Sequence, residues 1–307
     1  MLSSDEVRAA RERLGPVGVW VGSLLGSTTI EQERQAARRI EELGYGSIWT
    51  GEIVGGKEAF AHQSLLLAAT SHIITGTGIA NVWARQPGTM EGGGATVGAA
   101  YPGRFVLGIG ISHGPIVELS GQVYAKPMET MMTYLDGMDA SVVFAPATEV
   151  PVPRVLAALR PKMLDLARER SDGAHPYLVP PAHTALARAA LGPDKLLIPE
   201  QAFVLETDPV EARRVGREHL SNYLRLPNYV NNLEHLGYGD DLVGGGSDRL
   251  VDAIVAWGEE DDIARRVAEH SANGADHVVL QPLGDLTTAV GQLERLAPVV
   301  LAGSSSR

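Results

Sequence analysis

The sequence contains no cysteine. This absence excludes disulfide bonds, thiolate metal sites and cysteine nucleophiles. No apolar run approaches the roughly 20 residues that a helix needs to cross a bilayer. The first residues, 1–6, also lack the basic and apolar regions of a signal peptide. We therefore expect a cytoplasmic protein without a membrane partner.

Positive charge is scarce as well. The net charge is −11, and no basic block interrupts the acidic surplus, so nucleic acid would be repelled and is not expected as a partner. A small anionic cofactor is compatible with this balance, because backbone amides and one or two arginines can hold a phosphate. The histidines lack the His-x3-His spacing of metal ligands, and no metal is predicted.

Helix and strand patterns alternate along the whole chain. An apolar run at residues 17–22 predicts a first strand, and Thr28 with Glu31 predicts a capping box that opens a helix. A second strand is expected at 47–50. Further strands are predicted at residues 105–111, 154–159, 175–179, 196–206 and 277–280.

The length of 307 residues suits two ordinary domains or one large α/β barrel. About eight strand candidates, most followed by a helical segment, favour a (β/α)8 TIM barrel. No break in composition marks a linker, so we expect one domain over residues 1–307, with an insertion near the glycine run 244–246.

Two strand-and-loop units are polar at one end. Residues 73–87 begin with β-branched apolar side chains and end in amide, indole and guanidinium groups, and residues 103–113 end in a hydroxyl and an imidazole. In a parallel barrel the functional site lies at the carboxyl ends of the strands. This asymmetry predicts an enzyme with its site at that edge.

Two residues are candidates for acid–base chemistry. His113 follows a predicted strand directly, and an imidazole with a near-neutral pKa suits proton transfer. Glu52 occupies a comparable place after the strand at 47–50. The structural alternatives are an imidazole that caps a loop and a glutamate that caps a helix or stays solvated.

Three other segments leave alternatives open. Residues 108–113 resemble a dinucleotide fingerprint, but His113 replaces its third glycine and earlier strands precede this one, so a Rossmann fold is disfavoured. Residues 171–176 form either a turn with a left-handed Gly173 or a backbone cradle for phosphate. Glu200 and Gln201, inside an apolar strand, either line the barrel mouth or pair internally.

Several short motifs together resemble one known superfamily. They lie at residues 78–87, 103–110, 171–177, 227–232 and 245–250. In their order and spacing the chain resembles the luciferase-like flavin and deazaflavin oxidoreductases. It is most similar to the coenzyme F420-dependent group that is common in actinobacteria.

The resemblance implies a barrel with a deazaflavin across its carboxyl face. In F420-using relatives a bulge in the third strand carries a non-prolyl cis peptide behind the ring, which corresponds here to Gly78 and Ile79. The family's phosphate-binding turn corresponds to Gly173 and Ala174. The implied cofactor-binding residues are Gly78, Ile79, Asn81, Trp83, Gly110, Ser112, Gly173, Ala174 and His175.

The implied function is an F420-dependent oxidoreductase that transfers a hydride between the deazaflavin C5 and a small, partly apolar organic substrate. The protein would supply orientation, a dry pocket and a proton donor, for which His113 is the candidate, with Glu52 beside it. One alternative is an FMN-dependent luciferase-like monooxygenase, and another is a non-catalytic cofactor-binding barrel. A homodimer is common among relatives, although no apolar stripe in this chain marks its interface. The identity of the substrate does not follow from the sequence.

Overall fold

The computed structural model describes residues 1–26, 28–141 and 144–302. Its strands are β1 (Val17–Trp20), β2 (Ser47–Thr50), β3 (Ile74–Thr77), β4 (Ala80–Asn81), β5 (Phe105–Gly110), β6 (Arg154–Leu156), β7 (Gly173–Ala174), β8 (Leu196–Leu197), β9 (Glu200–Val204), β10 (Val255–Trp257) and β11 (Val278–Pro282). Its α-helices are α1 (Ser4–Leu14), α2 (Ile30–Glu42), α3 (Ala59–Ala69), α4 (Pro87–Ala100), α5 (Gly114–Leu119), α6 (Pro127–Asp139), α7 (Pro161–Arg170), α8 (Pro181–Leu191), α9 (Pro209–Tyr223), α10 (Pro227–His235), α11 (Asp248–Ile254), α12 (Glu260–Ala272) and α13 (Leu286–Val300). Short 3-10 helices are η1 (Gly22–Leu25), η3 (Gly239–Asp241) and η4 (Val243–Gly245).

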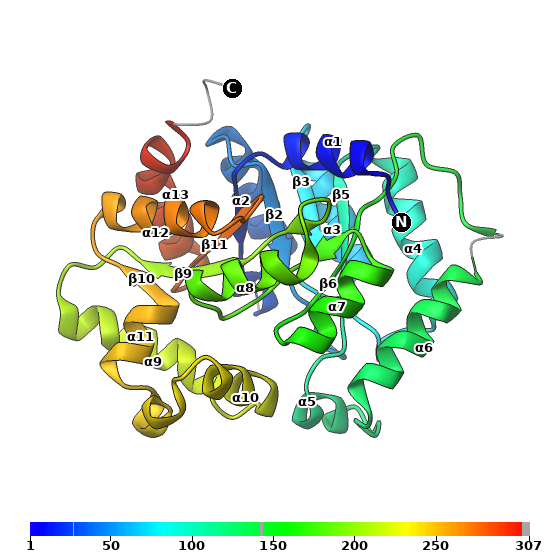
Figure 1. Cartoon of the computed structure of the whole chain (residues 1–307). Coiled ribbons are helices and arrows are strands. Elements are labelled where there is room, and N and C mark those ends of the chain that lie inside the picture. Colours follow the sequence, from blue (N-terminus) through cyan, green and yellow to red (C-terminus); the bar gives the residue numbers. More distant parts are fainter. Residues whose placement is uncertain (27, 142–143, 303–307) are drawn as a thin grey trace.

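The strands form one parallel sheet that is curled into a half-barrel with helices around it (Figure 1). Neighbouring strands follow the order β10–β9–β11–β1–β2–β3–β5–β6–β7–β8, and β4 pairs with β5. Every pairing among the described strands is parallel. The predicted α/β fold built from alternating strands and helices is therefore confirmed.

The first unit shows how local sequence sets these elements. The cap of α2 lies one residue later than predicted, because the Thr29 hydroxyl accepts from the Gln32 amide, and Gln32 accepts from the Thr29 amide in return. Thr28 instead donates to Glu33 at 2.7 Å. The apolar face of α2 is buried as expected, through Ala36, Ala37 and Ile40 (relative exposure of 5%, 2% and 1%).

Some predicted strand ends were wrong. The strands expected at 105–111, 154–159 and 277–280 are β5, β6 and β11 with shifted ends. Residues 175–179 are not a strand: β7 ends at Ala174, and the chain turns at Leu178, which has a φ of 58°. The segment 196–206 forms two strands, separated by Ile198 and Pro199.

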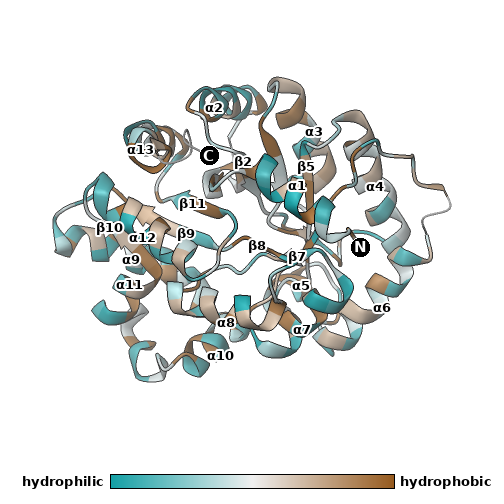
Figure 2. Cartoon of the chain, turned by 45° about the horizontal axis from the view of Figure 1, so that its top comes forward, coloured by the Kyte–Doolittle hydropathy of each residue, from teal (hydrophilic) through white to brown (hydrophobic). Residues whose placement is uncertain are grey.

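Polar and apolar surfaces are arranged around the sheet as burial requires. Helix α1 packs Val7, Ala10 and Leu14 into the core at the amino-terminal edge of the strands, at the top of Figure 1. In Figure 2 the strands at the centre are largely brown, whereas α2 at the periphery is largely teal. No helix in the described part of the chain is long and apolar enough to span a membrane.

An insertion between β9 and β10 reaches the carboxyl-terminal edge of the sheet, opposite α1. It comprises α9, α10, η3, η4 and α11, which contain the glycine run expected inside an insertion. Helix α10 lies at the lower edge of Figure 1, and the Asn228 amide donates to the Ser112 carbonyl at 3.4 Å. The insertion therefore extends over the carboxyl ends of the strands.

The close approach of β3 and β5 gives a stability prediction. The Thr77 hydroxyl bonds both the amide and the carbonyl of Gly108, and a Cβ on Gly108 would lie 2.0 Å from the Thr77 carbonyl oxygen. Gly108→Ala should lower the free energy of unfolding by about 1–3 kcal/mol in a urea titration. Gly92→Ala is the control: a Cβ there meets nothing within 4 Å on α4, so stability should rise by about 0.5–1 kcal/mol. Equal effects of the two substitutions would contradict this packing.

Candidate active site

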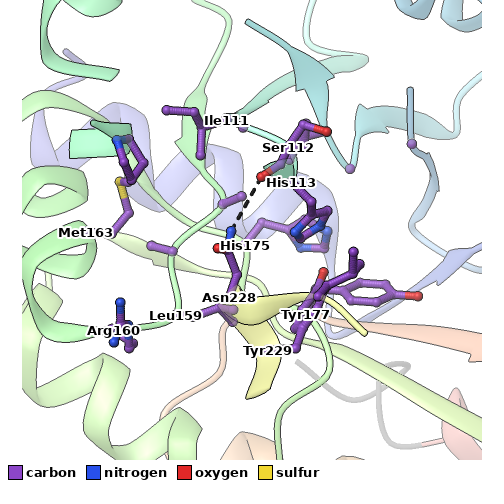
Figure 3. A pocket seen from close by; sticks show the side chains of 18 of the residues that line it. Ile111, Ser112, His113, Leu159, Arg160, Met163, His175, Tyr177, Asn228 and Tyr229 are labelled. Carbon is purple, nitrogen blue, oxygen red and sulfur yellow. Dashed lines mark hydrogen bonds between the residues drawn. The ribbon is translucent and has the colours of Figure 1, made fainter. Parts of the chain in front are cut away.

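A cavity of about 630 Å³ opens at the carboxyl edge of the sheet, where the site was predicted. Its wall comes from the segments that follow the strands: residues 51–53 after β2, 78–79 after β3, 110–113 after β5, 157–159 after β6, and His175 and Tyr177 after β7. Trp20 at the end of β1 and side chains of α5, α6, α7, α9 and α10 also line it. Figure 3 shows His113, His175, Tyr177 and Tyr229 around this space.

Two small residues shape one side of the cavity. The peptide bond between Gly78 and Ile79 is cis, which confirms the expectation from the family resemblance. A Cβ on Gly78 would lie 2.6 Å from Trp20 Nε1 and 2.9 Å from His175 Nε2, and one on Gly110 would lie 2.4 Å from Ile79 Cγ1. Glycine is therefore required at both places to keep the bulge and the cavity as they are.

The Glu52 carboxylate accepts four hydrogen bonds. Its donors are the backbone amides of Asn81 (2.7 Å) and Ala59 (3.0 Å) and both terminal nitrogens of Arg85, one of them at 2.9 Å. The Glu52 and Arg85 side chains are 3% and 6% exposed. A carboxylate offers about four acceptor positions, so this one has none left for a substrate. Glu52 lines the cavity as predicted, but its geometry favours a positioning role over the catalytic role expected for it.

His113 lies where the sequence placed it, directly after β5 and in the wall of the cavity. Its ring centroid is 5.0 Å from that of Tyr229. Its Nδ1 is buried without a hydrogen-bond partner among the described residues. Burial lowers the pKa of His113 to about 4, so the imidazole is neutral at pH 7.

His175 is held in one orientation. Its Nδ1 donates to the Ile198 carbonyl at 2.7 Å, which leaves Nε2 unprotonated, and the ring stacks on Trp49 at a centroid distance of 4.8 Å. Burial lowers the pKa of His175 to about 4. Of the other predicted cofactor residues, Gly110 and Ser112 also line the cavity, and Ser112 adopts a left-handed backbone with a φ of 58°.

Asn81 and Trp83 support the cavity from behind and do not line it. The Asn81 amide donates to Glu52, and its side-chain oxygen accepts from the Trp83 amide. The Trp83 indole donates to the Ile111 carbonyl at 2.8 Å. Both residues thus fix the backbone after β4 and β5.

Gly173 and Ala174 are not in the cavity wall. They form β7, in register with β6 on one side and β8 on the other. A Cβ on Gly173 would lie 2.2 Å from the Leu196 carbonyl oxygen, so this glycine is required by strand packing. We expected these two residues to form a phosphate cradle. The structure corrects this expectation, because their backbone pairs with the neighbouring strands of the sheet.

Two groups of wall residues were missed in the sequence. Arg160 and Lys162 are exposed at the start of α7, where they line the cavity beside the helix N-terminus. Tyr177, Tyr223 and Tyr229 come from three separate segments. The proline that opens α7 marked a helix start next to a predicted strand, and Tyr229 lay within a resemblance motif, but nothing local joined these residues to one site.

No group of three histidine, aspartate or glutamate side chains in the part of the chain described here could hold a metal ion. Two buried histidines outside the cavity wall have protein partners. His62 bonds Glu33 at 2.6 Å, and His270 bonds Thr184 at 2.8 Å. The cavity is the candidate active site, and its polar groups include histidines, tyrosines and the cations of α7.

A parallel α/β fold with this cavity at its carboxyl edge has known relatives. The family described as luciferase-like monooxygenase matches residues 15–277. A 5,10-methylenetetrahydromethanopterin reductase of Archaeoglobus fulgidus is 24% identical over 294 residues, which cover 80% of this chain and 87% of that protein.

Solved structures share the fold. An F420-dependent secondary alcohol dehydrogenase in complex with an F420–acetone adduct superposes with a TM-score of 0.75 at 14% identity, covering 93% of this chain and 99% of the other. The oxygenating constituent of 3,6-diketocamphane monooxygenase from Pseudomonas putida, in complex with FMN, has a TM-score of 0.66 at 11% identity, covering 94% and 97%.

The chain is thus an oxidoreductase enzyme with a half-barrel of parallel strands. It belongs to the luciferase-like monooxygenase family. The superfamily and the enzyme class expected from the sequence are both confirmed.

Arg85 pairs with the buried Glu52 and with the half-exposed Glu58. We expect their replacement to lower the free energy of unfolding by different amounts. Glu52→Gln removes the buried carboxylate that bonds both terminal nitrogens of Arg85 and leaves only the half-exposed Glu58 to pair with this buried charge, so it should cost about 3–5 kcal/mol of unfolding free energy. Glu58→Gln should cost less than about 1 kcal/mol, because Glu58 contacts the same arginine from a side chain that is 50% exposed. Urea unfolding of both variants measures the difference. A Glu52→Gln protein as stable as the wild type would show that this carboxylate is not a structural anchor.

Proposed function

We propose that the protein is an F420-dependent oxidoreductase that exchanges a hydride with a small, partly apolar organic substrate. The observation that carries the proposal is the cavity of about 630 Å³ at the carboxyl ends of the strands, bounded on one side by Gly78, Ile79 and Gly110. The name of the F420-dependent alcohol dehydrogenase supports the cofactor, and the name of the Archaeoglobus protein supports a reductase. When bound, the deazaflavin supplies the hydride carrier.

The residues present fit such a cofactor. Gly78, Ile79 and Gly110 line one side of the cavity, where a flat ring could lie against them. The space that a Cβ on either glycine would need is taken by Trp20, His175 and Ile79, so glycine keeps this wall in place. Arg160 and Lys162, at the N-terminus of α7, would hold a phosphate-bearing tail through charge and backbone amides. We assign the tail to this helix rather than to Gly173 and Ala174.

His113 is the proposed proton-transfer residue. Because burial lowers the pKa of His113 to about 4, the imidazole at neutral pH is set to accept a proton from a substrate hydroxyl. Donation in the reductive direction requires that the ring be protonated first. Glu52 acts indirectly, by holding Asn81 and Arg85 and with them the bulge.

The alternative is an FMN-dependent monooxygenase. It is favoured by the camphane monooxygenase, which shares the fold and binds FMN. Such an enzyme would need a reductase and molecular oxygen, and its cofactor also carries a phosphate that Arg160 and Lys162 could hold. Cofactor preference therefore separates the two functions.

We further propose that the strands close into a complete (β/α)8 barrel forming a single domain over residues 1–307. Strand β8 pairs with β7, and β9 pairs with β11. Two residues, Ile198 and Pro199, separate β8 from β9. The segment that contains β8 and β9 would therefore join the two ends of the curled sheet.

Titration of the purified protein with F420 and with FMN, followed by quenching of tryptophan fluorescence, tests the cofactor. F420 should bind at least about 10-fold tighter, equivalent to roughly 1.4 kcal/mol. A preference for FMN would replace the proposed function by the monooxygenase.

Variants test the assignment of the tail. The double variant Arg160→Gln/Lys162→Gln should weaken F420 binding by about 10-fold or more, since each charged hydrogen bond contributes about 1.5–3 kcal/mol. The deazaflavin core without phosphate and tail should bind this variant as it binds the wild type. Arg168→Gln, on the exposed side of the same helix, is the control and should change neither affinity.

His113→Ala should keep F420 affinity but slow hydride transfer, and an unchanged rate would remove His113 from the chemistry.

A further inference from the structure

Four aromatic side chains gather at one end of the cavity. This aromatic box consists of Trp20, Tyr177, Tyr223 and Tyr229. The ring centroid of Tyr177 lies 5.4 Å from that of Trp20 and 5.3 Å from that of Tyr223, and those of Tyr223 and Tyr229 are 5.2 Å apart. Tyr177 and Tyr229 stand apart from Arg160 in Figure 3. The box is therefore separate from the proposed tail site.

The hydroxyl groups of the box are oriented by a hydrogen-bond chain. Tyr177 donates to the Gln281 side-chain oxygen at 2.7 Å, so Tyr223 must donate its proton to Tyr177, at 2.6 Å. The hydroxyl protons of Tyr177 and Tyr223 are thus both used in these hydrogen bonds, and the Tyr223 oxygen keeps its lone pairs. The box thus lines the cavity with aromatic rings and with an oxygen that keeps its lone pairs, and both attract positive charge.

A carboxyl group lies behind the box. Glu200, on β9, is 1% exposed, and its Oε2 accepts from the Leu178 amide at 3.1 Å. Its Oε1 is buried without a partner among the residues that the structure describes. Burial raises the pKa of Glu200 to about 8, and a cation nearby would favour the ionised form.

No arginine or lysine contributes to the box, whose members are all aromatic. The histidines that contact its rings are His113, 5.0 Å from Tyr229, and His219, 5.0 Å from Tyr223. Burial lowers the pKa of each to about 4, so both are neutral at pH 7. His235 lies in the cavity wall at the exposed end of α10. With its pKa raised to about 8, Glu200 is mostly protonated at pH 7 in the empty site, and a bound cation would favour its ionised form.

We propose that the aromatic box is a subsite for a small organic cation, an alkyl-substituted ammonium group on the substrate. The aromatic rings that line the cavity and the Tyr223 lone pairs would replace part of the hydration of the cation, and Glu200, once ionised, would attract the cation from behind the rings. The assignment deepens the proposed function, since it names the substrate class of the same cavity. Cation binding does not require the cofactor, so the cation subsite and the proposed F420-dependent function can be tested separately.

Choline and 3,3-dimethylbutan-1-ol form a matched pair of probes, identical in shape except for carbon in place of the charged nitrogen. Isothermal titration of the full-length protein should show choline binding at least about 10-fold tighter than the alcohol. Tyr229→Leu and the nearly isosteric Glu200→Gln should each weaken choline by about 10-fold while changing the alcohol less than about two-fold. Tyr101→Leu, outside the cavity wall, is the control and should change neither.

Equal affinity for the two probes, or no choline binding by wild-type protein that binds F420, would overturn the cation subsite and leave the proposed function standing. Selective choline binding by protein that fails to bind F420 would overturn the proposed function and leave the cation subsite standing. Unchanged choline affinity in Glu200→Gln and Tyr229→Leu, with near-ultraviolet circular dichroism like that of the wild type, would also overturn it.

Discussion

The Glu52 carboxylate is the constraint on which the site depends. It joins four parts of the chain, since it follows β2, accepts from the amides at the end of β4 and the start of α3, and pairs with the arginine before α4. Such a buried pair is costly to break, because removing Glu52 leaves the buried Arg85 charge with only the half-exposed Glu58 as a partner. These bonds hold the backbone next to Gly78 and Ile79 in place, and they do not need a ligand in the cavity.

Around this anchor the cavity has two unlike ends. The end at α7 is basic and exposed, and it suits an anionic tail. The other end is aromatic, with a buried carboxyl behind it and neutral histidines beside it. An acidic protein can hold an anionic cofactor in this way, because the few cations that matter are placed at a helix N-terminus. The middle of the cavity, between Gly78 and His113, is left for the reacting groups.

Sequence patterns located the site because polarity changes along single strands. The run that ends in His113 showed this change, and Glu52 stood just past the predicted strand at 47–50; the structure brings the two residues to one cavity. The Gly78–Ile79 bulge was implied by family resemblance rather than by any local pattern. These features are short-range, and the carboxyl edge of a parallel sheet gathers them automatically.

The rest depends on contacts that are distant in the chain. Glu52 looked like a free acid because its partner Arg85 lies 33 residues away. Gly173 looked like a turn because two-residue strands give no periodic signal, yet its lack of a side chain serves the packing against Leu196. The tyrosines of the aromatic box belong partly to an insertion whose position over the sheet only the folded chain determines.

A crystal structure of the protein with F420 tests the central claim most directly. The account predicts a deazaflavin ring against Gly78 and Ile79, with its phosphate at Arg160 and Lys162 and the aromatic box left open. A ring elsewhere in the cavity, or a phosphate at Gly173 and Ala174, would contradict it.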